Sequence, residues 1–202
     1  MSDINQDLFQ LAMSEKARPL MAAVQKHIAE NVEPITEEFF RLNDEKTDRW
    51  SWHPRQLELL EGAKNKAKES GLWNFFLPDS EIGSGLTNLD YAYIAVELGK
   101  SPLASESLNC SAPDTGNMEV LERVGTPEQK KKWLEPLLNG EIRSAYAMTE
   151  PDVPSSDAKN VRTSAVLDGD EWVINGEKFY ISGAGDPRCK IMIVMVKTSP
   201  NA

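Results

Sequence analysis

The sequence predicts an α+β protein in which a helical domain, residues 1–140, precedes a partial β-domain, residues 141–202. Apolar residues recur at helical spacing in the first part and at strand spacing after Gly140. Helix-capping signals, such as Thr126 ahead of Pro127 and Gln129, lie in the first part. Five short strand-like runs follow Gly140. Five strands of this length close only a small, open sheet.

The helices of the first part are bounded by proline, glycine and capping residues. Pro19 either starts a second helix or kinks one, and the first helical pattern is expected to end before Pro34. Gly71 and Thr87 are expected to end one helix and to cap the start of the next. In chain order the expected helices are Leu8–Glu30, Thr36–Leu42, Pro54–Ser70, Asn88–Leu98, Asp114–Val124 and Pro127–Leu138.

The strands of the second part are separated by turn residues. Asp168-Gly169-Asp170 predicts one turn. Asn175-Gly176 lies between apolar runs, and Asn-Gly is the strongest short-range hairpin signal, so we expect it at a hairpin tip. The expected strands are Arg143–Met148, Val161–Leu167, Trp172–Ile174, Phe179–Ile181 and Ile191–Val196.

Composition excludes several classes of protein. The chain has 202 residues, 22 of them Lys or Arg and 32 Asp or Glu, and its net charge of −10 argues against nucleic acid as a partner. Cys110 and Cys189 have no metal-ligand or disulfide spacing, so no metal is expected and a reducing compartment fits. No apolar run is long enough to span a membrane, and residues 1–7 lack a secretory or transit pattern. The expected location is cytoplasmic.

A polar turn follows the first expected strand. Pro151 and Pro154 remove backbone donors and stiffen this turn. Thr149, Ser155 and Ser156 supply hydroxyl groups, and free N–H groups in such a turn can bind an anion or a heteroatom-rich ring. The alternative is that these hydroxyls only satisfy the backbone of the turn. The residues alone leave both readings open.

The motifs around this turn resemble those of one family. Thr149-Glu150-Pro151 leads to Ser156-Asp157, and Ile174-Asn175-Gly176 is followed by Lys178 and Ile181-Ser182. This set resembles the acyl-CoA dehydrogenases, FAD enzymes of fatty acid β-oxidation. Cys110–Met118 and Ser182–Lys190 look most like family members ten and eleven. The resemblance implies an N-terminal helical domain, a β-barrel-like middle domain that is truncated here, and a C-terminal helical domain that these residues do not contain.

The resemblance also implies a reaction, the FAD-dependent α,β-dehydrogenation of an acyl-CoA thioester. The family's base is a Glu of the C-terminal domain, so no catalytic residue is expected before Ala202 and the chain alone is expected to be inactive. Ser156 matches a residue near both FAD and acyl-CoA, but the longer turn leaves the choice between Ser155 and Ser156 open. The implied cofactor-binding residues are Tyr146, Met148, Thr149, Ser155, Ser156, Tyr180, Ile181 and Ser182.

The family further implies partners and alternatives. Electron-transfer flavoprotein is the expected electron acceptor, and a homodimer or homotetramer is the expected assembly. An acyl-CoA oxidase of the same superfamily and a non-catalytic acyl-CoA- or protein-binding module are the alternative functions. Tyr180 has its own plain alternative, as an ordinary strand aromatic.

Overall fold

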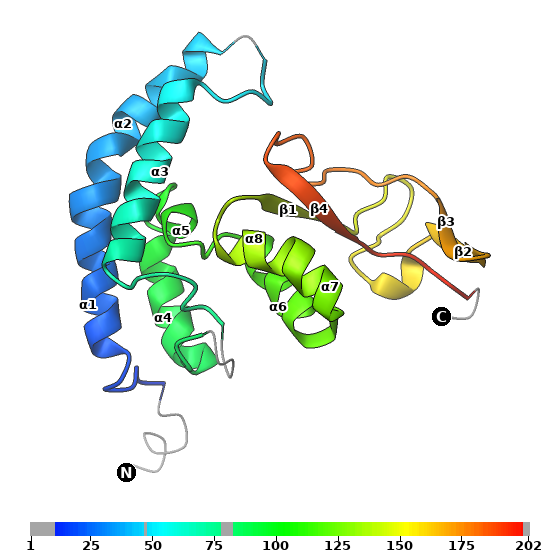
Figure 1. Ribbon diagram of the computed structural model, residues 1–202, viewed down its shortest axis with the longest axis horizontal. Helices are drawn as coiled ribbons and strands as arrows, with labels where there is room; N and C mark the ends of the chain where they lie inside the picture. The colour runs from blue at the N-terminus through cyan, green and yellow to red at the C-terminus, as the bar shows by residue number, and fades with distance from the viewer. Residues whose placement is uncertain (1–10, 47, 78–82, 200–202) are drawn as a thin grey trace, which may run out of the picture. The chain divides into compact units, whose positions relative to one another are not determined.

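A computed structural model describes residues 11–46, 48–77 and 83–199. Its contacts divide the chain into two compact units, residues 1–115 and 116–202. Helices make up the described part of the first unit, and the strands all belong to the second (Figure 1). The predicted fold class, helices first and a partial β-structure after them, is confirmed.

The first unit begins with one continuous helical run. It comprises α1 (Arg18–His27), the π turn η1 (Ile28–Val32), α2 (Glu33–Arg41) and the 3₁₀ turn η2 (Leu42–Glu45). Pro19 lies in the first turn of α1, where its missing N–H costs nothing. Of the expected helix Leu8–Glu30, residues 8–10 lie outside the described residues, and its expected course over residues 11–17 is wrong because the helix begins only at Arg18.

The expected helix end before Pro34 is wrong, because α2 carries Pro34 in its first turn. The Glu33 N–H donates to the carbonyl of Ile28, five residues back, which is the π pattern. Such a widened turn accommodates the proline ring, which would otherwise clash with a carbonyl of the preceding turn. The helix therefore absorbs the proline instead of ending at it.

The remaining helices of this unit are α3 (Pro54–Glu69), α4 (Asn88–Leu98) and α5 (Ala104–Ser107). The predicted caps are confirmed. Thr87 Oγ1 accepts a 3.1 Å bond from the Asp90 N–H, and Gly71 follows α3 with a φ of +68°. The core of the unit is apolar, and its most buried members include Val24, Val32, Leu60, Ala67, Phe75, Ile94 and Leu108.

The second unit contains most of α6 (Asp114–Val124), which begins just before the unit boundary. It continues with α7 (Pro127–Gln129), the π turn η3 (Lys130–Leu134) and α8 (Glu135–Leu138). The predicted Thr126 capping box is present, with the Gln129 side chain accepting from the Thr126 N–H. A π turn again directly precedes a Glu-Pro pair, here at Pro136. Both prolines are therefore carried inside helical runs by the same device.

In the described part of the chain, four strands form two small sheets. The strands β1 (Arg143–Ala147) and β4 (Cys189–Val194) pair in parallel, and β2 (Ser164–Asp168) and β3 (Glu171–Asn175) pair antiparallel. A bridge between Ser164 and Lys197 links the two pairs. The 3₁₀ turn η4 (Ala158–Asn160) precedes β2. Within the described residues these strands form no closed barrel.

The expected hairpin tip at Asn175-Gly176 is wrong. The hairpin turns at Gly169 and Asp170, within the other predicted turn, and Gly169 has the positive φ of +61° that such a loop needs. Asn175 instead ends β3 opposite Ser164. Val173 and Ile174 pair with β2, which precedes β3 in the chain. The described residues after Gly176 therefore do not turn back to pair with β3. Tertiary pairing therefore overrides the local signal.

The expected strand Phe179–Ile181 is also wrong. Residues 176–181 have no regular structure, and Tyr180 has a left-handed φ of +52°. A non-glycine residue with positive φ is uncommon and marks a turn or a strained position. Tyr180 and Ser182 therefore do not lie on a common strand.

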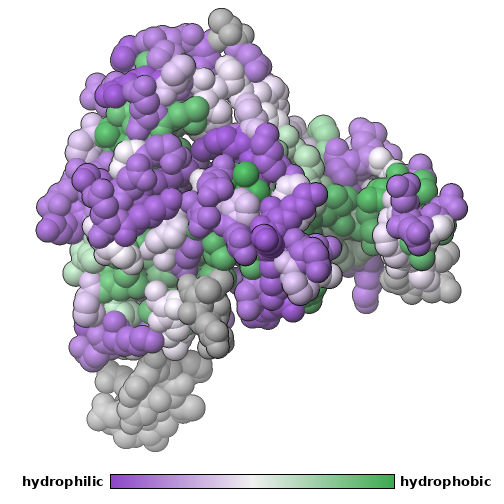
Figure 2. Space-filling view, in the orientation of Figure 1, coloured by the Kyte–Doolittle hydropathy of each residue, from purple (hydrophilic) through white to green (hydrophobic). Residues whose placement is uncertain are grey.

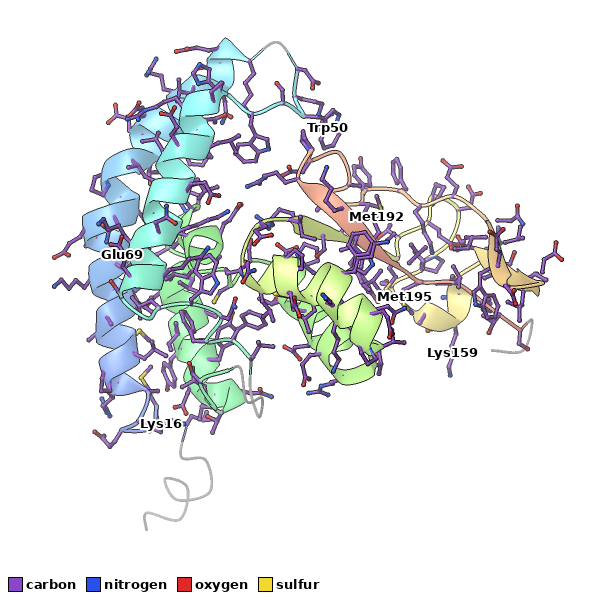
Figure 3. All side chains as sticks on the ribbon, viewed as in Figure 1. Lys16, Trp50, Glu69, Lys159, Met192 and Met195 are labelled. Carbon is purple, nitrogen blue, oxygen red and sulfur yellow. The ribbon has the colours of Figure 1, made fainter. Side chains whose placement is uncertain are left out.

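The strands carry much of their apolar surface outward. Figure 2 shows apolar residues at the surface of the strand-containing unit. Met192 on β4 is 46% exposed, and Met195 continues this strand with its N–H bonded to the carbonyl of Ala147 (Figure 3). No helix among the described residues is long and apolar enough to cross a membrane.

Candidate functional site

The polar turn after β1 is closed by its own side chains. The Glu150 N–H donates to Ser155 Oγ at 2.7 Å, and Ser155 is only 2% exposed. Asp157 caps η4 by accepting from the Lys159 N–H. The Ser155 hydroxyl is therefore used inside the turn, whereas Ser156 is exposed on it.

The carboxylate of Glu150 is the centre of the turn. It is buried, and it accepts from the N–H groups of Arg162 and Thr163 at 2.7 and 2.9 Å and from Thr163 Oγ1 at 2.6 Å. Lys178 Nζ donates to the same carboxylate at 2.8 Å. Four donors from two other chain segments therefore converge on one acidic side chain.

These contacts decide the protonation of Glu150. Burial alone raises the pKa of this carboxyl group, but the Lys178 ammonium, the Thr163 hydroxyl and the two backbone N–H groups together lower the pKa from 4.5 to about 2. Glu150 is thus ionised at neutral pH and is a weak base.

We expect this carboxylate to make stability depend on acid pH. Its folded pKa lies below its unfolded value, so its contribution is fully present above about pH 4.5 and is lost as the pH falls towards 2. Thermal unfolding midpoints between pH 6 and 2 measure this effect. The difference between the native protein and a Glu150→Gln variant is expected to shrink below pH 4.5, and a constant difference across that range would contradict the assignment.

Lys178 and Phe179 join this turn to the segment after β3. Lys178 Nζ donates to the carbonyl of Met148 at 3.1 Å as well as to Glu150. The Phe179 N–H donates to the carbonyl of Thr149 at 2.8 Å. Residues about 30 positions apart in the chain are thereby held side by side.

The structure brings several of the predicted cofactor-binding residues to these joined segments. Met148 and Thr149 lie on one segment, and Tyr180 directly follows Phe179 on the other. Thr149 is exposed, and Tyr180 is 82% exposed with its ring centroid 4.1 Å from that of Phe179. Ile181 is half-buried, and Tyr146 and Ser182 are exposed. Ser155 is set apart from them because its hydroxyl is bonded inside the turn.

Most of the chain matches models of one family. The N-terminal domain model of the acyl-CoA dehydrogenases matches residues 14–141, and the middle domain model matches residues 145–202. The chain belongs to the acyl-CoA dehydrogenase family. The members of this family bind FAD. The resemblance inferred from the motifs around Thr149 and Asn175 is therefore confirmed.

Individual relatives and a solved structure support membership of the acyl-CoA dehydrogenase family. Acyl-CoA dehydrogenase family member 10 of Mus musculus is 48% identical over 94% of this chain, and family member 11 of Gallus gallus is 49% identical over 92%. A solved Mycobacterium abscessus protein described as an acyl-CoA dehydrogenase is 49% identical over 95% of the chain, with a TM-score of 0.85. The chain spans 18% and 23% of the two curated relatives and 48% of the solved chain.

The sequence did not predict the hydrogen bonds and the ion pair that hold the Glu150 carboxylate in this acyl-CoA dehydrogenase chain. From the sequence, Glu150 and Lys178 are only members of two separate motifs, with no pairing between them, and Thr163 has no expected role. A usable signal exists, since Glu150 in the first family motif and Lys178 in the second carry opposite charges. The pairing of these charges predicts that the two motifs meet.

Proposed function

We propose that this chain supplies the FAD-binding segments of an enzyme that dehydrogenates acyl-CoA thioesters between the α and β carbons. The observation that carries the proposal is the joining of Thr149 to the Phe179–Tyr180 segment by the Phe179 N–H. The family motifs that bear the implied cofactor-binding residues meet at this bond, although some 30 residues separate them.

The residues present fit a flavin ring. Such a ring needs an apolar face and hydrogen-bond donors at its polar edge. Tyr180 offers an aromatic ring that is 82% exposed, and Thr149 and Ser182 offer exposed hydroxyl groups. Because Ser155 is bonded inside the turn, Ser156 is the serine we assign to FAD and the acyl-CoA.

FAD supplies the hydride-accepting chemistry when bound, and the protein binds, orients and tunes it. Thr149 would hold the polar edge of a bound flavin through its hydroxyl, together with the backbone of Met148 and Thr149. Tyr180 would pack against the ring and exclude water from it. The proton is removed by a base in the family's C-terminal domain, so these residues contribute binding and charge stabilisation.

We further propose the partners that the family implies. Electron-transfer flavoprotein receives the electrons, and the full-length protein assembles as a homodimer or homotetramer. The acyl-CoA thioester is the proposed substrate, and Ser156, which is exposed on the turn, is the serine assigned to it.

Visible spectroscopy of the full-length protein tests the proposal. Bound flavin absorbs near the wavelengths of free FAD, and anaerobic addition of an acyl-CoA is expected to bleach this absorbance. Rapid recolouring in air with formation of hydrogen peroxide would indicate the oxidase. A purified protein without flavin absorbance, and with none after incubation with FAD, would contradict the proposal and favour a binding module.

Tyr180→Gly is expected to weaken FAD binding while leaving the fold intact. Glycine takes the φ of +52° freely, and a left-handed φ costs other residues roughly 1–2 kcal/mol, so the variant loses no backbone stability. The lost aromatic contact is worth about 0.5–1.5 kcal/mol, which corresponds to roughly a two- to tenfold higher dissociation constant. Fluorescence titration with FAD and thermal unfolding measure the two effects. A variant that binds FAD as tightly as the native protein would exclude Tyr180 from the flavin site.

A further inference from the structure

The Glu150–Lys178 ion pair touches both of the segments that are proposed to hold the flavin. Lys178 Nζ bonds the carbonyl of Met148, one residue before Thr149, and Glu150 directly follows Thr149. The Phe179 N–H, one residue after Lys178, bonds the carbonyl of Thr149. The ion pair therefore contacts the backbone on both sides of Thr149, with Lys178 at the Met148 carbonyl before it and Glu150 directly after it.

The pair is shielded from solvent. The side chains of Glu150 and Lys178 are 5% and 12% exposed. At such burial opposite charges interact strongly, and removal of one partner leaves the other uncompensated. With Lys178 gone, Glu150 still accepts from the Thr163 hydroxyl and from two backbone N–H groups, which favour its charged form. Glu150 would thus keep donors to its carboxylate without Lys178, and Lys178 would keep the Met148 carbonyl as an acceptor without Glu150.

We propose that Glu150 and Lys178 form a positioning pair that fixes Thr149 towards the flavin and whose opposite charges cancel at that site. This inference rests on the proposed function. Neither residue is assigned a contact with the cofactor, and both act through the Met148–Glu150 backbone. Because reduction adds negative charge to a flavin, an uncancelled charge beside it changes its reduction potential.

In the full-length protein, removal of the two charges is expected to shift the reduction potential of the flavin in opposite directions. Glu150→Gln leaves the Lys178 ammonium uncompensated, which favours the reduced flavin and raises the potential. Lys178→Gln leaves the Glu150 carboxylate uncompensated, which lowers the potential. We expect each shift to correspond to about a tenfold change in the equilibrium between oxidised and reduced flavin, or about 30 mV for a two-electron couple. Glutamine keeps a hydrogen-bonding group in both variants.

Two controls separate charge from packing. Thr163→Val removes one hydrogen bond to Glu150 with no change of charge or shape, and Lys178→Arg keeps the positive charge. Because neither control variant changes the charge, we expect the flavin reduction potential of each to stay within about a few millivolts of the native value. Potential shifts of opposite sign in the two Gln variants, with unshifted controls, support the pair. Shifts of the same sign, or no shift in either Gln variant, overturn it.

A measurement without FAD covers variants that lose the cofactor. The Phe179 amide, which donates to Thr149, reports the position of this backbone by hydrogen exchange in the apoprotein. Its exchange is expected to be at least tenfold faster in both Gln variants than in Thr163→Val. Equal exchange in all three variants would overturn the positioning role. If the native full-length protein binds no FAD, the proposed function fails, and this exchange measurement still decides whether the pair positions Thr149.

Discussion

Gly176→Ala is expected to destabilise the strand-containing unit by about 3 kcal/mol. A Cβ at this position would lie 2.4 Å from Thr163 Oγ1 and 2.7 Å from Thr163 Cα. Backbone cannot give way as a side chain can, and overpacking typically costs about 1–3 kcal/mol. Gly176 also has a φ of +153°, and a sparsely populated backbone conformation adds about 1–3 kcal/mol for other residues. The displaced Thr163 would pull its two hydrogen bonds away from Glu150.

Gly169→Ala is the matched control for this prediction. Gly169 has a φ of +61° in the β2–β3 turn, and an added Cβ there meets no heavy atom within 4 Å. It should lose only the roughly 1–2 kcal/mol of a left-handed φ. A loss of about 3 kcal/mol lowers the thermal midpoint by roughly 6–12 °C in a domain of 150–250 residues. If both variants lowered the midpoint equally, the close contact with Thr163 would have no energetic role.

The 202-residue chain by itself is expected to show no acyl-CoA dehydrogenase turnover. None of its residues matches the family's base. Glu150 is the carboxylate next to Thr149, but its pKa of about 2 makes it a weak proton acceptor. Its oxygens also already accept from Arg162, Thr163 and Lys178. General-base catalysis favours a pKa near the working pH and typically contributes about 10²- to 10⁴-fold.

An assay with a long-chain acyl-CoA and an artificial electron acceptor measures this turnover. The chain supplemented with FAD is expected to give the rate of the buffer, whereas the full-length protein is expected to be active under the same conditions. Turnover by the 202-residue chain above that background would place a base within it. Glu150 would then be the first residue to substitute, because it adjoins the proposed flavin turn.

Several elements were predictable from local sequence because local contacts determine them. Thr87 and Thr126 cap helices through hydrogen bonds that reach only three residues. Gly71 has the left-handed φ that a helix end requires. The turn at Asp168-Gly169-Asp170 likewise needs only its own residues. Pro34 was misjudged because a helical pattern alone does not show that a π turn can precede it.

The sequence by itself determined the change from helices to strands after Gly140, the family and the set of residues around Thr149 that carry the proposed chemistry. Periodicity, caps and motif residues are local properties, so they can be read without the fold. Only the tertiary structure decided that β3 pairs back onto β2, that Gly176 lies against Thr163, and that Lys178 reaches Glu150 and Met148. The contacts of Gly176 and Lys178 join residues 13 to 30 positions apart, and burial of the Glu150 charge makes its partner necessary.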